Sequence, residues 1–293
     1  MNSNFDPSDL LQRFYPLYKW DYNGDTHNMH VDISSLSFLA KVLNKKRKQI
    51  LADHPNPDQE YIDRSYMQGK QEVKASAWLE YIDYALIKCY LDLKKYKELA
   101  EFFSNADRVF CNNIKERVRR FIETVEKESQ VDVTLKKMIL AFLYEIIEDY
   151  AKALDYWRDY VFSKASEQDQ TPFKVAIRIL INSQSNKPLF FDLLVRHVEW
   201  LSHGMSTLQQ LFGNIRIDTI MPDTIHDRLR SVKESKDYHS IMENFYNTMI
   251  RVHKIRSETY HTELAKIYLK KALSGSASDY EEFRAFIRDP TSM

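Results

Sequence analysis

The sequence LIKCY at residues 86–90 is followed by KYKELAEFF at residues 95–103, and the same kind of pair recurs further along the chain. LAFLY at residues 140–144 is followed by DYAKALDYW at residues 149–157. A third stretch, LAKIY at residues 264–268, repeats the first half of the pair. Apolar residues in these stretches recur at spacings of three and four, which places them on one stripe of an α-helix.

Short polar joints separate the two halves of each pair. The joints are Lys94-Lys95 and Glu148-Asp149, and each would fold its two helices into a hairpin. A helical hairpin cannot bury its apolar stripe alone, so it stacks on neighbouring hairpins. The predicted fold class is therefore all-α, specifically an α-solenoid of stacked helical hairpins similar to the repeats of the clathrin heavy chain.

Helical patterns also dominate the rest of the chain. Residues 53–72 contain two prolines and a glycine and are interpreted as a long loop. A strand-like run at residues 215–220 precedes Pro222, and the last three helices are predicted at residues 236–254, 257–273 and 278–288. No convincing strand pair is predicted. The predicted organisation is an N-terminal part of helices and linkers (residues 1–75), followed without a break by the hairpin array (residues 76–293).

Composition excludes several classes of protein. The 293 residues carry 42 basic and 42 acidic side chains, which argues against nucleic acid as the main partner. Only 5 glycines occur, and glycine-rich phosphate loops need more. The two cysteines indicate a reducing compartment rather than a disulfide framework. Without a long apolar run or an apolar leader, the chain is expected to be soluble and cytosolic.

Four stretches, in order along the chain, resemble the TGF-β receptor-associated protein family. They are Asp6-Pro7 with the sequence FYPL at residues 14–17, YIDYALIKCY at residues 81–90, YAKALDYW at residues 150–157, and ETYHTELAKIYL at residues 258–269. The second is similar to the family's IDTALLKCY helix, and the fourth to its EEYHTxLAxLYL helix. These two are the specific matches.

The resemblance implies a function. Members of the family are subunits of the CORVET and HOPS vesicle-tethering complexes. By resemblance the chain is a non-enzymatic scaffold without cofactors that docks other helical tethering subunits and associates peripherally with endosomal or vacuolar and lysosomal membranes. The resemblance also implies that a full-length protein containing this chain would bind a small GTPase or a receptor tail. The family's N-terminal citron-homology propeller is absent here, so the chain is expected to be a central fragment or a truncated relative.

Two other functions stay open at this stage. One is a different helical adaptor, of the coat or cargo-receptor type. The other is an all-α enzyme, which would need convergent carboxylates or a metal site. No spacing of residues provides such a site. We therefore expect no catalytic, cofactor-binding or metal-binding residues.

Isolated features with chemically reactive residue types favour structural roles. The acidic loop at residues 21–32 has Thr26 where a calcium loop requires glycine, which favours an ordinary linker. His261 and Cys89 lie on helical stripes and are expected to pack. The basic run at residues 45–48 indicates either a solvated helix end or a contact with anionic lipid or an acidic partner.

The C-terminal end is predicted to dock the partner. The helix predicted at residues 257–273 has apolar residues on two sides, and its only successor is short, which would leave apolar surface uncovered. The candidate anchors are Tyr268, Leu269, Phe283 and Phe286. The alternative is that the last helix folds back and seals the stripe.

Overall fold

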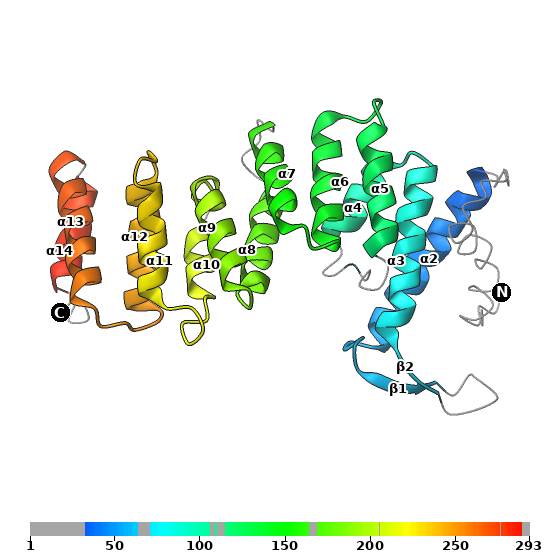
Figure 1. Ribbon diagram of the computed structural model, residues 1–293, viewed down its shortest axis with the longest axis horizontal. Helices are drawn as coiled ribbons and strands as arrows, with labels where there is room; N and C mark the ends of the chain where they lie inside the picture. Colours follow the sequence, from blue (N-terminus) through cyan, green and yellow to red (C-terminus); the bar gives the residue numbers. More distant parts are fainter. Residues whose placement is uncertain are drawn as a thin grey trace. The chain divides into compact units, whose positions relative to one another are not determined.

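The computed structural model describes residues 33–63, 71–105, 109, 115–163, 169–204, 206–275 and 277–288. Within these residues the chain is all-α, with thirteen α-helices, one 3₁₀ turn and one short pair of strands (Figure 1). Contacts divide the chain into two compact units, residues 1–131 and residues 132–293. The boundary predicted near residue 75 stays a prediction, and the first stretch of resemblance, Asp6-Pro7 with residues 14–17, lies outside the described residues.

Unit 1 is built on two long helices that pack against each other, α2 and α3. Its elements are α2 (Ile33–Asp53), β1 (Glu60–Asp63), β2 (Gln71–Lys74), α3 (Ala75–Asp92), α4 (Tyr96–Asn105) and α5 (Lys115–Lys127). The ring of Tyr84 on α3 stacks on Phe121 of α5 at 5.1 Å between centroids. The apolar stripe predicted from the sequence is the inner face of α3, where Leu79, Leu86 and Ile87 are fully buried.

The strand pair corrects the sequence prediction of a loop at residues 53–72. β1 and β2 form an antiparallel hairpin whose register runs from Glu60 opposite Lys74 to Asp63 opposite Gln71. Each strand has four residues, so neither is long enough to show a clear two-residue periodicity. Pro55 and Pro57, which suggested a loop, lie outside the strands, and Gly69 lies outside the described residues.

A buried ion pair connects α2 to α3. The guanidinium Nε of Arg47 lies 2.6 Å from the Asp83 Oδ1, and its Nη2 lies 3.3 Å from Oδ2. Asp83 is fully buried and Arg47 is 9% exposed. The Asn44 amide also donates to the Tyr90 hydroxyl at 2.5 Å. Polar contacts between the two helices therefore reinforce their apolar packing.

The two hairpin joints share one backbone geometry. At the first joint the Lys95 N–H donates to the Tyr90 carbonyl at 2.8 Å; at the second, the Asp149 N–H donates to the Tyr144 carbonyl at 3.0 Å. Lys94 and Glu148, one residue earlier, have φ of 53° and 63°. This is the Schellman ending of a helix, with a left-handed residue that is usually glycine. The repeat predicted from sequence is thus also a repeat of local structure.

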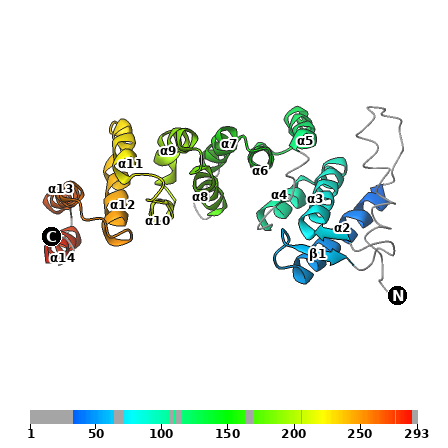
Figure 2. The same cartoon turned by 60° about the horizontal axis from the view of Figure 1, so that its bottom comes forward.

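Unit 2 consists of helices that pack mainly on helices close to them in sequence. They are α6 (Val133–Ile146), α7 (Tyr150–Ser163), α8 (Thr171–Ser183), α9 (Lys187–Leu201), α10 (Thr207–Gly213), α11 (Pro222–Leu229), the 3₁₀ turn η1 (Arg230–Val232), α12 (Tyr238–Arg251), α13 (Glu258–Ser274) and α14 (Ala277–Arg288). Helices α13 and α14 lie side by side in both views (Figures 1 and 2). Such neighbour-to-neighbour packing is what a solenoid requires, and the solenoid arrangement itself stays a prediction.

Aromatic side chains form much of the unit 2 core. Trp157 of α7 is fully buried and meets Phe142 of α6 edge-on at 4.8 Å between centroids. Further along, the His226 Nε2 and the Tyr246 hydroxyl are 3.0 Å apart, and the Tyr260 hydroxyl donates to the Asp223 carboxylate at 2.5 Å. Burial raises the pKa of both tyrosines. This cluster joins α11, α12 and α13.

The predicted C-terminal helices are found with only small shifts at their ends, as α12, α13 and α14. The interpretation of residues 215–220 as strand-like is wrong, because these residues form irregular backbone and a turn. Ile215 and Ile220 are nevertheless buried. Their apolar character reflects burial within the connection rather than pairing in a sheet.

Candidate docking site

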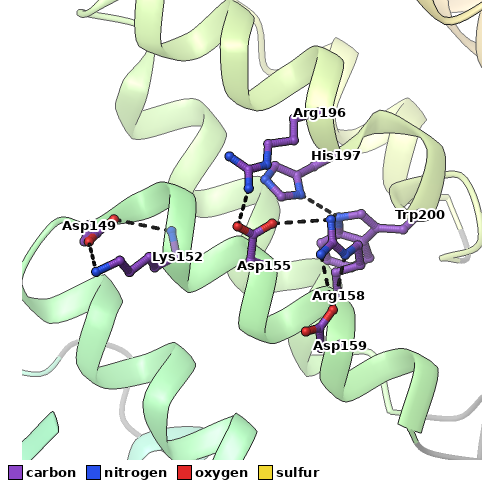
Figure 3. Close-up of polar contacts among 8 residues, drawn as sticks. All are labelled: Asp149, Lys152, Asp155, Arg158, Asp159, Arg196, His197 and Trp200. Carbon is purple, nitrogen blue, oxygen red and sulfur yellow. Dashed lines mark hydrogen bonds and ion pairs between the residues drawn. The ribbon is translucent and has the colours of Figure 1, made fainter. Parts of the chain in front are cut away.

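A network of charged side chains connects α7 to α9 (Figure 3). The Arg196 Nη2 of α9 lies 2.5 Å from the Asp155 Oδ2 of α7. Arg158 on α7 lies 3.3 Å from both Asp155 and Asp159. The side chains are partly exposed, with Arg196 at 48% and Asp155 at 26%. The network contains residue types that also occur in active sites. Here, however, each carboxylate is neutralised by an arginine at the edge of a helix pair.

His197 lies beneath this network and is fully buried. The Trp200 Nε1–H donates to the His197 Nδ1 at 3.1 Å, while Nε2 has no hydrogen-bond partner in the described part of the chain. Burial, together with the positive charges of Arg196 and Arg158, lowers the pKa of His197 to about 3. The ring is therefore neutral at physiological pH, and it is too deeply buried to exchange protons with a substrate.

The buried histidine predicts an acid-sensitive unit 2. The unfolded chain protonates His197 near pH 6.5 and the folded chain only near pH 3, so falling pH favours the unfolded state between these values. Going from pH 7 to pH 5, the histidine should lower the free energy of unfolding by about 2 kcal/mol. Urea denaturation followed by circular dichroism measures this loss.

The matched variant is His197→Phe, which keeps a ring but removes the titration. It should start less stable at pH 7, because Trp200 loses its acceptor, and should then lose about 2 kcal/mol less than the parent between pH 7 and pH 5. Equal losses in parent and variant would contradict a depressed histidine pKa.

The other residues considered for chemistry behave as structural groups or lie outside the described residues. Burial raises the pKa of the Cys89 thiol to about 12, so the thiolate that reactive cysteines need is not formed. His261 is half-buried on α13 beside fully buried Leu264. The acidic loop at residues 21–32 and Cys111 lie outside the described residues.

The four predicted docking anchors occupy different environments. Tyr268 and Phe286 face each other, with ring centroids 5.2 Å apart, and are 7% and 5% exposed. The Asn247 side-chain amide also donates to the Tyr268 hydroxyl at 2.9 Å. Phe283 is half-buried, and Leu269 is 43% exposed. Helix α14 therefore covers Tyr268. The docking role of the four residues stays a prediction, and only Leu269 and Phe283 are accessible to a partner.

A groove beside α9 is a second candidate that sequence reasoning did not identify. It has a volume of ≈ 860 Å³ and runs between α9 on one side and α11 with η1 on the other. Its apolar lining is Pro188, Phe191 and Val195, and its charged lining is Lys187, Asp192, Asp227 and Arg228. The Arg228 guanidinium carbon lies 5.7 Å from the centroid of the Phe191 ring, within the range of a cation–π contact.

The start of α9 explains how the groove forms. The Asn186 side chain caps the helix by accepting from the Leu189 N–H at 3.3 Å, and Pro188 occupies its first turn. Leu193 and Leu194 are fully buried, which leaves Phe191 and Val195, four residues apart, on the opposite side. Phe191 lies next to the buried stripe in sequence, so the pattern alone does not distinguish it from a core residue.

Within the described part of the chain, no helix is both long and apolar enough to cross a membrane. The same residues contain no cluster of three or more histidine, cysteine or acidic side chains placed to hold a metal ion. Comparison of the chain with family models, with curated proteins and with solved structures finds no match.

Proposed function

We propose that this chain is a non-enzymatic helical scaffold that docks another helical subunit in endosomal or vacuolar vesicle tethering. The α9–α11 groove is the observation that supports docking. The tethering role and the peripheral membrane location rest on the four stretches of resemblance to CORVET and HOPS subunits. Most of the residues of the α3 stretch are core residues, including Leu86, and the α13 stretch contributes Tyr260, Leu264 and Tyr268 to the core. The resemblance therefore speaks for a shared fold more than for a shared surface.

The chemistry of the groove fits the apolar ridge of a partner helix. Pro188, Phe191 and Val195 offer an apolar floor, onto which side chains spaced three and four residues apart on a helix can pack. Lys187 and Arg228 at the rim are exposed and form no ion pair with any described residue. These two cations would pair with acidic side chains that flank the ridge of the partner helix, while Asp192 and Asp227, which also line the groove, would face basic ones.

Affinity purification of the full chain from cell lysate tests the proposal. The parent should recover tethering-complex subunits, and Lys187→Glu/Arg228→Glu should recover at least tenfold less, because both rim cations become repulsive. The control is Arg216→Glu/Lys236→Glu, which makes the same charge change at exposed positions elsewhere in unit 2. Circular dichroism should show that both variants are folded, since all four side chains are exposed and the groove variant loses only the contact of Arg228 with the Phe191 ring.

The possible results separate the alternatives. If the parent recovers coat or cargo-receptor proteins but no tethering subunit, the chain is a different adaptor. If the groove variant recovers the tethering subunits as well as the control does, docking occurs elsewhere. A Leu269→Ser variant then tests the C-terminal prediction, since Leu269 is the most exposed of its four anchors.

A further inference from the structure

One face of α2 is a stripe of exposed cationic and aromatic side chains. Phe38, Lys41, Lys45 and Lys48 are spaced by three, four and three residues, which places them within about 80° of one another around the helix. All four are exposed, Phe38 to 70%. The opposite face, with Leu36, Leu39, Leu43, Arg47 and Ile50, is buried. This set of Phe38, Lys41, Lys45 and Lys48 is called the cationic stripe.

No acidic side chain among the described residues neutralises the lysines of the stripe. Lys41, Lys45 and Lys48 form no ion pair with described residues, and α2 has no acidic side chain before Asp53. Elsewhere in the described chain lysines do pair, for example Lys88 with Asp92 at 3.1 Å and Lys271 with Glu243 at 2.5 Å. In a chain whose formal net charge is zero, the stripe is a local excess of positive charge.

The four residues of the basic run at residues 45–48 have two different roles. Arg47 turns inward to the Asp83 carboxylate, so only the lysines contribute to the surface. Lys46, half-buried beside the stripe, also lacks an ion pair among the described residues. Lys41, Lys45 and Lys48 share one face because of their spacing, and the inward contact of Arg47 with Asp83 of α3 is consistent with that face pointing away from α3.

An exposed phenylalanine at the end of a lysine stripe indicates what binds there. Lysine is a point charge on a flexible stem, suited to a diffuse anionic surface, whereas planar two-point recognition of a single carboxylate favours arginine. The four side chains lie on one exposed face of the helix, so a flat surface can reach all of them at once. Basic helices with an aromatic side chain lie in this way on anionic lipid.

We infer that the cationic stripe of α2 binds an anionic membrane surface, with Phe38 inserted among the headgroups and Lys41, Lys45 and Lys48 paired with lipid phosphates and carboxylates. The inference does not depend on the groove or on the tethering role. It assigns membrane contact to this chain's own residues.

Co-sedimentation with vesicles tests the inference on the full chain. The vesicles contain either phosphatidylcholine alone or phosphatidylcholine with about 30% phosphatidylserine, as in the cytoplasmic leaflet. The parent should bind the anionic vesicles only. Each lysine near such a surface contributes about fivefold in affinity, so Lys41→Gln/Lys45→Gln/Lys48→Gln should bind on the order of 100-fold more weakly. Raising the salt concentration should also weaken the binding of the parent to the anionic vesicles, because salt screens the attraction.

The matched control is Lys97→Gln/Lys127→Gln/Lys174→Gln, which removes the same charge from three exposed lysines outside α2. It should bind like the parent. Lys41→Arg/Lys45→Arg/Lys48→Arg should keep binding because the charge is kept, and Phe38→Ser should weaken it. Melting temperatures check that all variants are folded.

Two results would overturn the inference. The first is equal binding of the stripe variant and the control variant. It would mean that the total charge of the chain, and not this face, determines binding to the vesicles. The second is no binding of the parent to anionic vesicles, with lysine-dependent binding to poly-glutamate instead, which would mean that the stripe docks an acidic protein segment.

Discussion

Replacing Arg47 with alanine is expected to lower the free energy of unfolding by about 3–5 kcal/mol, because a fully buried carboxylate then loses its cationic partner. The guanidinium contacts both oxygens of Asp83, at 2.6 and 3.3 Å. The same group lies over the Phe102 ring, with its central carbon 5.3 Å from the centroid. Alanine removes both contacts and takes the guanidinium away from the buried carboxylate of Asp83.

Chemical denaturation of unit 1 measures this effect, and two further variants identify its cause. Lys48→Ala, at an exposed position one residue away, should change the stability by less than about 0.5 kcal/mol. Arg47→Met/Asp83→Leu removes both charges and should recover most of the loss, as apolar replacements of buried ion pairs do. If Arg47→Ala unfolds at the denaturant concentration of the parent, the ion pair contributes nothing to stability.

The second large effect is expected at Leu86, which is fully buried on α3. Leu86→Ala should cost about 2–5 kcal/mol through lost contacts and the cavity left behind. Leu86→Asp should cost more, because a carboxyl group must also leave water. Thermal melting followed by circular dichroism compares the two variants under the same conditions.

The pH dependence of the aspartate variant gives an independent check. Burial should raise the pKa of the introduced carboxyl in the folded state above its unfolded value. The folded state then binds the extra proton more tightly, so the cost of the substitution should shrink as the pH falls from 7 towards 4. If Leu86→Asp melts at the temperature of the parent at pH 7, the stripe is exposed and not buried.

Much of the fold follows from the periodicity of the sequence. Apolar residues spaced by three and four predicted α3, α4, α6 and α7, and the buried residues Leu99, Phe103, Leu140 and Leu154 lie on the predicted stripes. The polar joints marked the helix ends correctly. These are local properties, which the order of residues along one helix already contains.

Tertiary placement could not be predicted in the same way. Periodicity identifies an apolar face on α13 but not which neighbour covers it, so Tyr268 was assigned to a docking surface although Phe286 packs on it. The groove depends on α9 and α11 meeting about 35 residues apart in sequence, and no single helix contains that information. Arg47 was grouped with its lysine neighbours because the partner that buries it lies on another helix.

The two Schellman joints have a consequence for how such a chain diversifies. Both copies keep one spacing, since Leu86, Lys94 and Phe103 lie 54 residues before Leu140, Glu148 and Trp157. The same turn is formed by two lysines in the first copy and by glutamate and aspartate in the second. A duplicated hairpin can therefore reverse the charge of its tip by substitution alone, without moving its backbone. The two joints of this chain differ in charge while they keep one turn, with Lys94 paired to Glu128 at the first and Asp149 accepting from the Lys152 N–H at the second.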